Sequence, residues 1–392
     1  MKRMLSTFLC AVLMISVFSL QGTAEKSEPA ALTVKAKAAV LMDAVTGDVL
    51  FAQSPHEKLY PASVTKVMSL LLFMEALDGQ TLHLTDTVTT SADAAKKGGS
   101  QIWLKEGETM TVDDLLKATV IGSANDACCV LAEKIAGSEQ AFVQMMNDRA
   151  QQLGMKETHF VNCTGLDDDT SEHLTSAYDV ALMSRELLRH EKIRDYTTVW
   201  MESLRNGETQ LVNTNKLVRF YAGTTGLKTG TTAKAGCCIT ASAERAGLHL
   251  IAVVLGADNS NDRFEGAKAM LNWGFASFET AKMTLDNANI ADVVVLGGIK
   301  ERITPAAKPL PTLTLKKGVK NTVEPMVTLP VDVEAPVEAG QVLGKVDFVA
   351  NGEVIASVDL IARAAVARLK PGDVLRRMLS SLTVRVSAYE ES

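Results

Sequence analysis

The sequence is poor in the cysteine patterns that build disulfide frameworks or zinc sites. It has six cysteines in 392 residues, and the five that follow Cys10 include two adjacent pairs, Cys128–Cys129 and Cys237–Cys238. An odd number that contains adjacent pairs does not fit a disulfide framework, and the spacing between cysteine and histidine is not that of a zinc site. We therefore expect small, buried, apolar cysteines and neither a metal nor another cofactor.

The sequence also lacks an excess of positive charge. It has 40 Lys and Arg residues against 46 Asp and Glu residues, and its formal net charge is −6 at pH 7. Proteins that bind nucleic acid gain most of their affinity from clustered Lys and Arg on phosphates. The sequence thus argues against a nucleic-acid partner.

The first 24 residues have the pattern of a secretory signal peptide. Lys2 and Arg3 precede an uncharged stretch, Met4 to Leu20, that is short for a membrane span, and small residues follow it. A basic stop-transfer flank is missing, and the residues before Cys10 are not the small ones of a lipoprotein signal. We expect cleavage after Ala24 and an exported protein at the outer face of the cytoplasmic membrane.

The rest of the chain divides into two parts of different pattern. The first part alternates strand and helix signals, with an antiparallel sheet expected around turns at residues 234–236 and 245–247. The expected strands and helices of this part are strands at 38–43 and 48–52 and helices at 62–78, 111–120, 126–136 and 262–275. After about residue 281, short β-rich runs and an Asn351-Gly352 hairpin turn predict a small all-β module.

The last residues, 371–392, have an amphipathic helical pattern. Val374, Leu375 and Met378 fall on one apolar stripe, while Arg376 and Arg377 fall elsewhere. Such a tail either lies on a membrane surface or packs on the protein, and the pattern leaves both interpretations open.

A lysine stands at the start of the apolar helix 62–78. In Ser63-Val64-Thr65-Lys66, the serine and the lysine are three residues apart, so a helix places both side chains on one face. A serine hydroxyl needs a base to become a nucleophile, and lysine is such a base only when its amine is neutral. Burial against the Leu-rich run that follows would lower the pKa of Lys66. The alternative is a solvated lysine on a helix.

Two further short motifs contain candidate site residues. Ser123-Ala124-Asn125 falls in an expected break between two helices, where its side chains either project into a cleft or cap the next helix. Lys228-Thr229-Gly230 falls on an expected strand of small residues, which a peptide can approach and pair with while Lys228 and Thr229 bind a carboxylate. The alternative is that Lys228 is an ordinary charge on an edge strand.

The ordered motifs S-x-x-K, S-x-N and K-T-G resemble those of the penicillin-recognising serine acyl-transferases, which are the penicillin-binding proteins and the serine β-lactamases. Within that superfamily, segments such as LMDAVTGDVLFAQ and IGSANDACCVLAE are similar to those of the low-molecular-mass D-alanyl-D-alanine carboxypeptidases. The resemblance implies an α/β catalytic domain at 36–280, with a five-stranded antiparallel sheet flanked by helices and a helical insert. A small β-sandwich domain at 283–370 would follow it.

The resemblance also implies a reaction and a role for each site residue. The protein would remove the terminal D-alanine of the peptidoglycan pentapeptide through an acyl-enzyme, and β-lactams would inhibit it. Implied roles are Ser63 as nucleophile, Lys66 as base, Ser123 and Asn125 as proton relay and acyl-amide contact, and Lys228, Thr229, Gly230, Thr231 and Arg263 as substrate-binding residues. Lys228, Thr229 and Arg263 would hold the terminal carboxylate, and the amides of Ser63 and Thr231 would form the oxyanion hole.

Two departures from related patterns bear on the activity. Class A β-lactamases have an E-x-x-L-N segment before K-T-G, and the nearest candidate, at residues 186–190, does not fit it. Thr231 stands where many relatives have a bulky His or aromatic residue, which leaves the substrate preference open. A muropeptide endopeptidase, a β-lactamase and a non-catalytic cell-wall binding protein remain alternatives.

Overall fold

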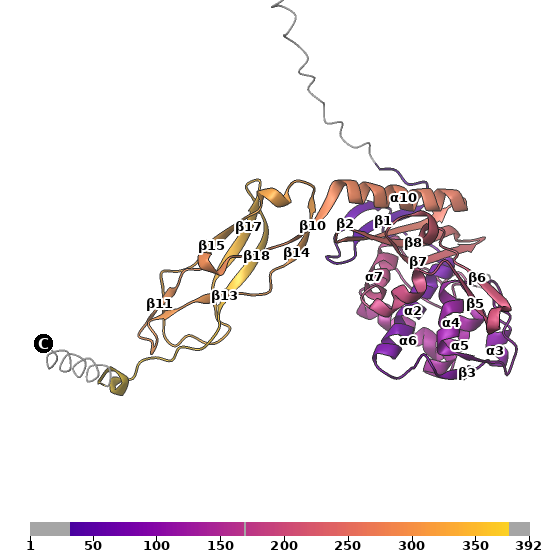
Figure 1. The fold of residues 1–392 in the computed structure, drawn as a ribbon, viewed down its shortest axis with the longest axis horizontal. Helices are drawn as coiled ribbons and strands as arrows, with labels where there is room; N and C mark the ends of the chain where they lie inside the picture. The colour runs from indigo at the N-terminus through magenta and orange to yellow at the C-terminus, as the bar shows by residue number, and fades with distance from the viewer. Residues whose placement is uncertain (1–31, 168–169, 376–392) are drawn as a thin grey trace, which may run out of the picture. The chain divides into compact units, whose positions relative to one another are not determined.

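The computed structural model describes residues 32–167 and 170–375. The expected signal segment, 1–24, and all but the first five residues of the expected tail, 371–392, lie outside the described residues and stay predictions. Within the described ranges, no helix is long and apolar enough to cross a membrane. Figure 1 shows a part built from a sheet and helices and a part built almost entirely from strands.

A five-stranded antiparallel sheet is the centre of the first part, as expected. Its order is β2-β1-β9-β8-β7. The strands are β1 (Ala38–Asp43), β2 (Val49–Gln53), β7 (Thr224–Thr232), β8 (Gly236–Arg245) and β9 (Leu248–Ala257). Every residue of β1 and β9 is buried, so both faces of the sheet are covered. Strand β7, which contains the K-T-G motif, is an edge strand.

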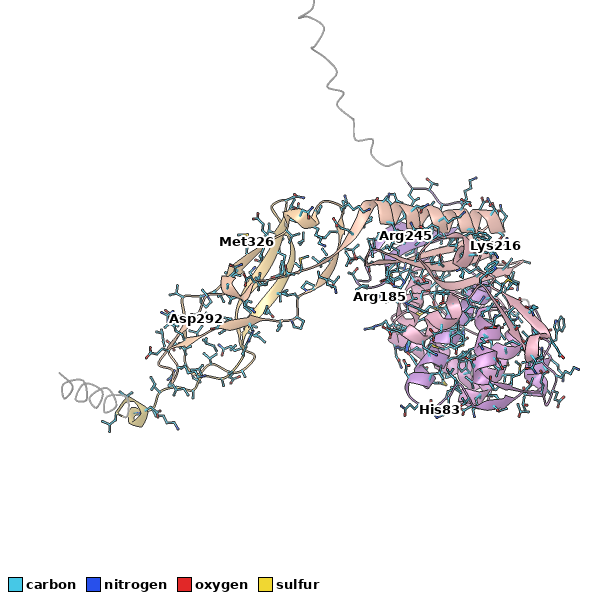
Figure 2. All side chains as sticks on the ribbon, in the orientation of Figure 1. His83, Arg185, Lys216, Arg245, Asp292 and Met326 are labelled. Atoms are coloured by element: carbon cyan, nitrogen blue, oxygen red, sulfur yellow. The ribbon has the colours of Figure 1, made fainter. Side chains whose placement is uncertain are left out.

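Helices cover the two faces of this sheet (Figure 1). On one face, α10 (Ser260–Ser277) packs on β8 and β9, and on the other, α7 (Ala177–Leu187) packs on β1 and β9. The helix α2 (Lys66–Asp78) packs on α7, and nine of its residues are buried, since it is apolar on every side. Figure 2 marks Arg245 at the end of β8. Its guanidinium lies over the rings of Tyr221 and Phe275.

The expected single helix at 62–78 is two elements. Residues Ala62–Thr65 form a 3-10 turn, η1, and α2 begins at Lys66. Ala62 has a φ of 48°, in the left-handed region that a residue with a Cβ rarely adopts, so the regular α-helix begins later than the hydrophobic pattern predicts. Ser63 therefore lies on a tight turn and Lys66 at the first position of a buried helix.

A helical region packs against α2 on the side away from the sheet. Its helix α4 (Val112–Val120) begins as expected, where the Thr111 hydroxyl accepts the Asp114 amide hydrogen at 3.1 Å. The break follows at residues 121–124, and α5 begins one residue earlier than expected. The other helices and strands of the first part are α3 (Ala92–Ala95), α5 (Asn125–Ala136), α6 (Glu139–Gln152), α8 (Arg194–Thr197), α9 (Leu217–Phe220), β3 (Thr87–Thr89), β4 (Thr109–Thr111), β5 (Met201–Leu204) and β6 (Thr209–Val212), of which α8 and α9 contact β7.

Strands dominate the chain from Phe278 onward, as expected. They form a four-stranded sheet of order β13-β18-β17-β15, a three-stranded sheet of order β12-β11-β16 and the pair β10-β14. The strands are β10 (Phe278–Lys282), β11 (Val293–Leu296), β12 (Arg302–Ile303), β13 (Pro305–Ala307), β14 (Thr312–Lys316), β15 (Glu324–Thr328), β16 (Asp332–Glu334), β17 (Val342–Ala350) and β18 (Glu353–Ala362). Asn351 and Gly352, with φ of 53° and 84°, make the expected hairpin turn. The limits 36–280, 283–370 and 371–392 remain our assignment.

Candidate active site

The Lys66 amine makes the central polar contacts of the site. Its Nζ lies 3.0 Å from Ser63 Oγ, 2.5 Å from Asn125 Oδ1 and 3.0 Å from the Thr164 carbonyl oxygen. The Asn125 amide has only one orientation that fits, because its Nδ2 donates to the Gly98 carbonyl at 2.7 Å. The structure thus brings together Ser63, Lys66 and Asn125 from the first two motifs.

Burial changes the protonation of Lys66. The side chain is fully buried, and this desolvation lowers the pKa of Lys66 from 10.5 to about 8. Asn125 Oδ1 and the Thr164 carbonyl only accept hydrogen bonds, so they take the two N–H groups of a neutral amine. The lone pair is then left for the Ser63 hydroxyl, and this arrangement suits a lysine that removes a proton from serine.

Ser123 lies on the turn between α4 and α5. Its φ is 61°, it is buried, and its hydroxyl has no hydrogen bond to another described residue. The residue that caps α5 is Ala124, and no side chain makes a cap hydrogen bond there, so the alternative in which this motif caps the helix is wrong. A strained turn with an unpartnered hydroxyl next to Asn125 is the kind of arrangement found at functional sites.

The third motif lies on β7, beside the nucleophile turn. A Cβ added at Gly230 would lie 2.7 Å from the Ser63 amide nitrogen and 2.9 Å from the Pro61 carbonyl oxygen. Only glycine allows this approach of the strand to the serine. The Thr229 hydroxyl lies 2.7 Å from that of Thr214, and Lys228 Nζ donates to the Thr229 carbonyl at 3.1 Å.

Three buried cations, Lys66, Lys228 and Arg263, belong to this site. Within the described chain none of them forms an ion pair with a carboxylate. Burial, and then repulsion from Lys66 and Arg263, lowers the pKa of Lys228 well below its usual range. A carboxylate that enters the site would offset this repulsion, so the electrostatics favour an anionic ligand.

Arg263 reaches β7 from α10. Its Nη1 donates to the Gly230 carbonyl at 2.9 Å and to the Thr231 hydroxyl at 2.9 Å, and its Nη2 lies 3.2 Å from Ser260 Oγ. Its Nε is buried without a partner among the described residues. The structure thus brings Arg263 to the K-T-G strand, where it supports Gly230 and Thr231 directly.

Three contributors to the site were not predicted from the sequence. The Thr164 carbonyl accepts from Lys66, although nothing in the residue type identifies a backbone acceptor. A Cβ at Gly165 would lie 1.8 Å from the Ala62 carbonyl oxygen, so the loop presses on the nucleophile turn opposite β7. Thr214 meets Thr229, and its neighbour Asn215 donates to the Gly226 carbonyl at 3.0 Å. The sequence signal that could have pointed to Thr214 is the pair of asparagines on either side of it, Asn213 and Asn215.

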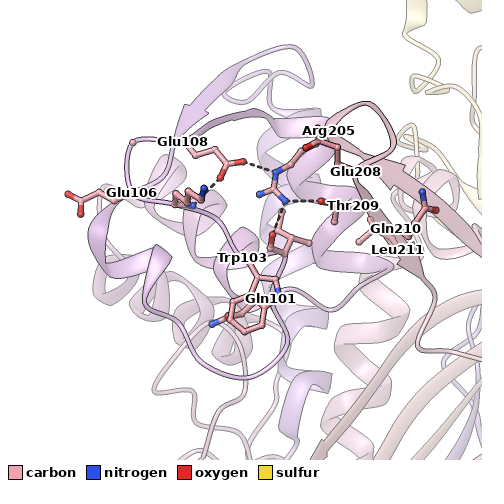
Figure 3. A pocket seen from close by; sticks show the side chains of 12 residues that line it. Gln101, Trp103, Glu106, Glu108, Arg205, Glu208, Thr209, Gln210 and Leu211 are labelled. Atoms are coloured by element: carbon pink, nitrogen blue, oxygen red, sulfur yellow. Dashed lines mark hydrogen bonds and ion pairs between the residues drawn. The ribbon is translucent and has the colours of Figure 1, made fainter.

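A large cavity opens beside the S-x-N turn (Figure 3). It has a volume of about 920 Å³ and lies between the loop 101–108 and the hairpin β5–β6. Asp126 anchors the loop by accepting the Leu104 amide hydrogen at 3.0 Å, and the Glu108–Arg205 ion pair, at 2.8 Å, joins loop and hairpin. Trp103 is 77% exposed on this loop. None of the residues that line the cavity belongs to the three motifs.

Comparison with known proteins identifies the family. The family model described as D-alanyl-D-alanine carboxypeptidase, Peptidase_S11, matches residues 23–259. The chain belongs to this D-alanyl-D-alanine carboxypeptidase family. A second model, the C-terminal domain of penicillin-binding protein 5, matches residues 278–368, which agrees with the all-β part.

Individual members of the D-alanyl-D-alanine carboxypeptidase family are similar over nearly the whole chain. DacF of Bacillus subtilis, a D-alanyl-D-alanine carboxypeptidase, is 41% identical over 93% of this chain and 94% of its own. The crystal structure of penicillin-binding protein 5 from Haemophilus influenzae has a TM-score of 0.77 and 32% identity, and covers 87% of this chain and 99% of its own. Ampicillin-bound penicillin-binding protein D2 from Listeria monocytogenes has a TM-score of 0.57 and 30% identity, covering 62% and 99%.

Replacing Gly230 by alanine tests the close approach of β7 to the nucleophile. The added methyl group would force the strand away from Ser63, and a displacement of about 1 Å at a reacting centre costs on the order of 10²-fold in rate. We expect Gly230→Ala to slow acylation by labelled penicillin about that much. Gly372→Ala, where a Cβ meets open space, is the control. A normal acylation rate in Gly230→Ala would contradict the steric argument.

The pH dependence of acylation tests the protonation of Lys66. Only a neutral amine can act as a base, and with a pKa of about 8 only about one-tenth of the Lys66 amines are neutral at pH 7, so a rate that depends on Lys66 as base should rise with pH through a midpoint near 8. We expect this rise in the second-order rate of acylation by a soluble penicillin. A rise centred near the ordinary lysine value of 10.5 would rule out the buried amine as base.

Proposed function

We propose that this D-alanyl-D-alanine carboxypeptidase removes the terminal D-alanine of the peptidoglycan pentapeptide through an acyl-enzyme on Ser63. The observation that supports this most is the position of the buried Lys66 amine, 3.0 Å from Ser63 Oγ, with two acceptors for its N–H groups. The substrate of such an enzyme lies outside the cytoplasm, which agrees with the export signal expected at residues 1–24.

Acylation begins when Lys66 takes the Ser63 proton and Ser63 Oγ attacks the carbonyl carbon of the penultimate D-alanine. The negative charge moves to the carbonyl oxygen, which the amides of Ser63 and Thr231 stabilise. The Ser63 amide lies in the first turn of η1, where it has no acceptor within the helix. Collapse of the intermediate breaks the peptide bond, and a proton relayed through Ser123 leaves with the amine of D-alanine.

Substrate orientation comes from β7 and from Asn125. Lys228 and Thr229 hold the terminal carboxylate, and Arg263 keeps Gly230 and Thr231 in place behind it. Asn125 Nδ2 is the donor for the acyl amide, for which it gives up its contact with the Gly98 carbonyl. Water then attacks the ester at Ser63, which releases the shortened peptide and restores the hydroxyl. β-Lactams acylate Ser63 by the same steps.

Intact-mass measurement after incubation with penicillin tests the nucleophile and the base. We expect the wild type to gain the mass of one penicillin, Ser63→Ala to gain none, and Lys66→Ala to gain it about 10²- to 10⁴-fold more slowly. Near-normal acylation of Lys66→Ala would show that another residue is the base. A mass increase in Ser63→Ala would overturn the assignment of the nucleophile.

A muropeptide endopeptidase is the second candidate, because the same arrangement of Ser63 and Lys66 can acylate on a D-alanyl cross-link. Product analysis separates the two functions. We expect free D-alanine from purified pentapeptide muropeptides at a rate well above that of monomer release from cross-linked dimers. Faster release of monomers would make the endopeptidase the main activity.

A further inference from the structure

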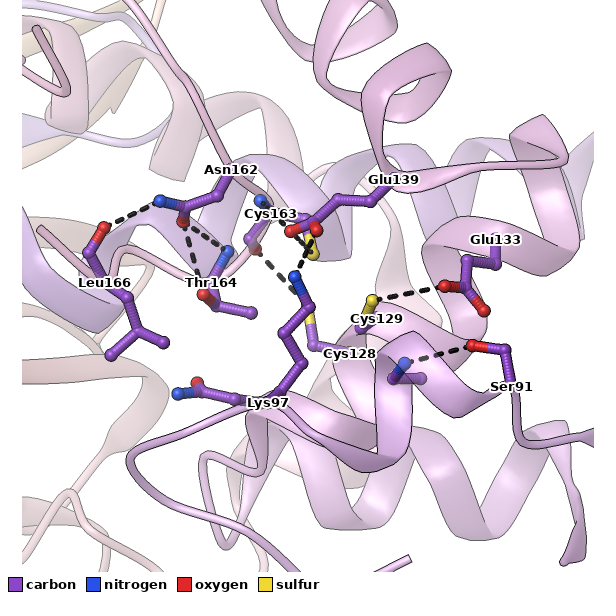
Figure 4. Close-up of polar contacts among 12 residues, drawn as sticks. Ser91, Lys97, Cys128, Cys129, Glu133, Glu139, Asn162, Cys163, Thr164 and Leu166 are labelled. Atoms are coloured by element: carbon purple, nitrogen blue, oxygen red, sulfur yellow. Dashed lines mark hydrogen bonds and ion pairs between the residues drawn. The ribbon is translucent and has the colours of Figure 1, made fainter. Parts of the chain in front are cut away.

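Three side chains near the active site have the chemistry of a metal site. They are Cys129 on α5, Glu139 at the start of α6 and Cys163 on the loop that precedes Thr164. Their sulfur and carboxylate oxygen atoms all lie within 4.8 Å of one another. Figure 4 shows the three side chains converging from these segments, with Lys97 reaching toward Glu139. The cysteine spacing in the sequence gives no sign of this group.

Each member of this cluster already makes polar contacts. Cys163 Sγ and the Cys163 amide nitrogen both lie 3.2 Å from Glu139 Oε1. Cys129 Sγ lies 3.6 Å from Glu133 Oε1, and Glu139 forms an ion pair with Lys97. The ammonium of Lys97 therefore lies where a metal cation would be attracted by the same carboxylate.

Solvent approaches the cluster on the side of the Lys97–Glu139 ion pair. Cys129 and Cys163 are completely buried, whereas the side chains of Lys97 and Glu139 are 24% and 20% exposed. A small cation can reach the two sulfur atoms from this side when Lys97 swings away. A tetrahedral ion needs a fourth ligand, which a water molecule would supply.

We propose that Cys129, Cys163 and Glu139 bind one thiophilic divalent cation of the Zn²⁺ and Cd²⁺ class. Two thiolates and one carboxylate suit such an ion better than Mg²⁺ or Ca²⁺, which prefer oxygen ligands. Binding replaces the Lys97–Glu139 ion pair by a metal–carboxylate bond. The two thiols each release a proton to solvent as the metal–sulfur bonds form, so the step needs no oxidant or reductant.

The cluster is linked to the catalytic amine through the backbone. The residue after Cys163 is Thr164, whose carbonyl accepts a hydrogen bond from Lys66. The Cys163 carbonyl also accepts the Ser69 hydroxyl of α2 at 2.6 Å and the Cys128 thiol at 3.4 Å. A metal bond to the Cys163 sulfur would therefore act on the segment that carries this acceptor of the Lys66 amine. Bound metal should therefore slow the acylation of Ser63, and this consequence alone rests on the proposed function.

Cobalt titration of the reduced, metal-free, full-length protein tests the binding. We expect one Co²⁺ to give a sulfur-to-cobalt charge-transfer absorption, which Zn²⁺ abolishes by competition. Cys129→Ser and Cys163→Ser should each weaken binding by more than about tenfold. Cys238→Ser, at a buried free cysteine on β8, is the matched control and should bind as the wild type does. Absence of the absorption in the wild type, or an equal absorption in Cys129→Ser and Cys163→Ser, would overturn the proposal.

Variants at two partly exposed residues, Glu139 and Lys97, test the site even if a cysteine variant does not fold. Glu139→Gln should weaken binding, and Lys97→Met should strengthen it, because the competing ammonium is gone. Weaker binding in Lys97→Met would contradict the site. A thiol titration of the denatured protein without reductant is the third measurement, since a Cys129–Cys163 disulfide in the purified protein would leave no ligands and also overturn the proposal.

The effect on catalysis is measured separately. Saturating Zn²⁺ should slow acylation by penicillin in the wild type and leave the rate of Cys163→Ser unchanged. An unchanged rate with the metal bound would disprove the link to Lys66, while the absorption titration would still report the site. Because binding is read by absorbance, failure of the metal site and failure of the proposed carboxypeptidase activity are distinguishable.

Discussion

The buried amine of Lys66 is the interaction on which the rest of the active site depends. It joins the turn that contains Ser63, the first residue of α5 and the loop at Thr164. A buried amine is costly unless its N–H groups have acceptors, so each of these segments has to be in place for the others to be stable there. The same burial that requires acceptors lowers the pKa of Lys66 and allows the lysine to act as a base. The contacts that hold these segments together and the lowered pKa therefore both depend on the Lys66 amine.

The second constraint is steric and acts on the nucleophile turn from two sides. Gly230 on β7 and Gly165 on the loop after Cys163 both approach the turn at distances that exclude a Cβ. Between them, Ala62 has a positive φ, which packing from both sides maintains. Gly230, the glycine of K-T-G, therefore lets β7 approach Ser63 more closely than any residue with a Cβ would allow.

Much of the fold was predictable because it depends on local patterns. The apolar run of β1 beside its turn, the cap at Thr111 and the Asn351-Gly352 turn are short-range signals, and the structure confirms each of them. The apolar run after Lys66 also predicted the burial of that residue correctly. The start of α2 was not predictable, because the left-handed Ala62 results from tertiary packing.

The parts of the site that the sequence did not reveal are contributed by the backbone or by long-range contacts. The Thr164 carbonyl is 98 residues from Lys66 in the sequence, and a backbone oxygen has no signature in a residue type. The proximity of Cys129, Glu139 and Cys163 likewise arises only when α5, α6 and a loop pack together. Local patterns predict which side chains can react, whereas tertiary packing decides which of them meet.

The three unpaired cations of the site have a consequence for the stability of the whole protein. Lys66, Lys228 and Arg263 repel one another in a setting with little water, so the ligand-free protein keeps an internal electrostatic stress that an apolar core would not have. The same three positive charges preorganise the site for an anion, because they are in place before the anion binds. The protein gives up some resistance to unfolding in exchange for a ready site, which is a trade-off between stability and activity. A bound carboxylate would offset this repulsion and so stabilise the folded protein.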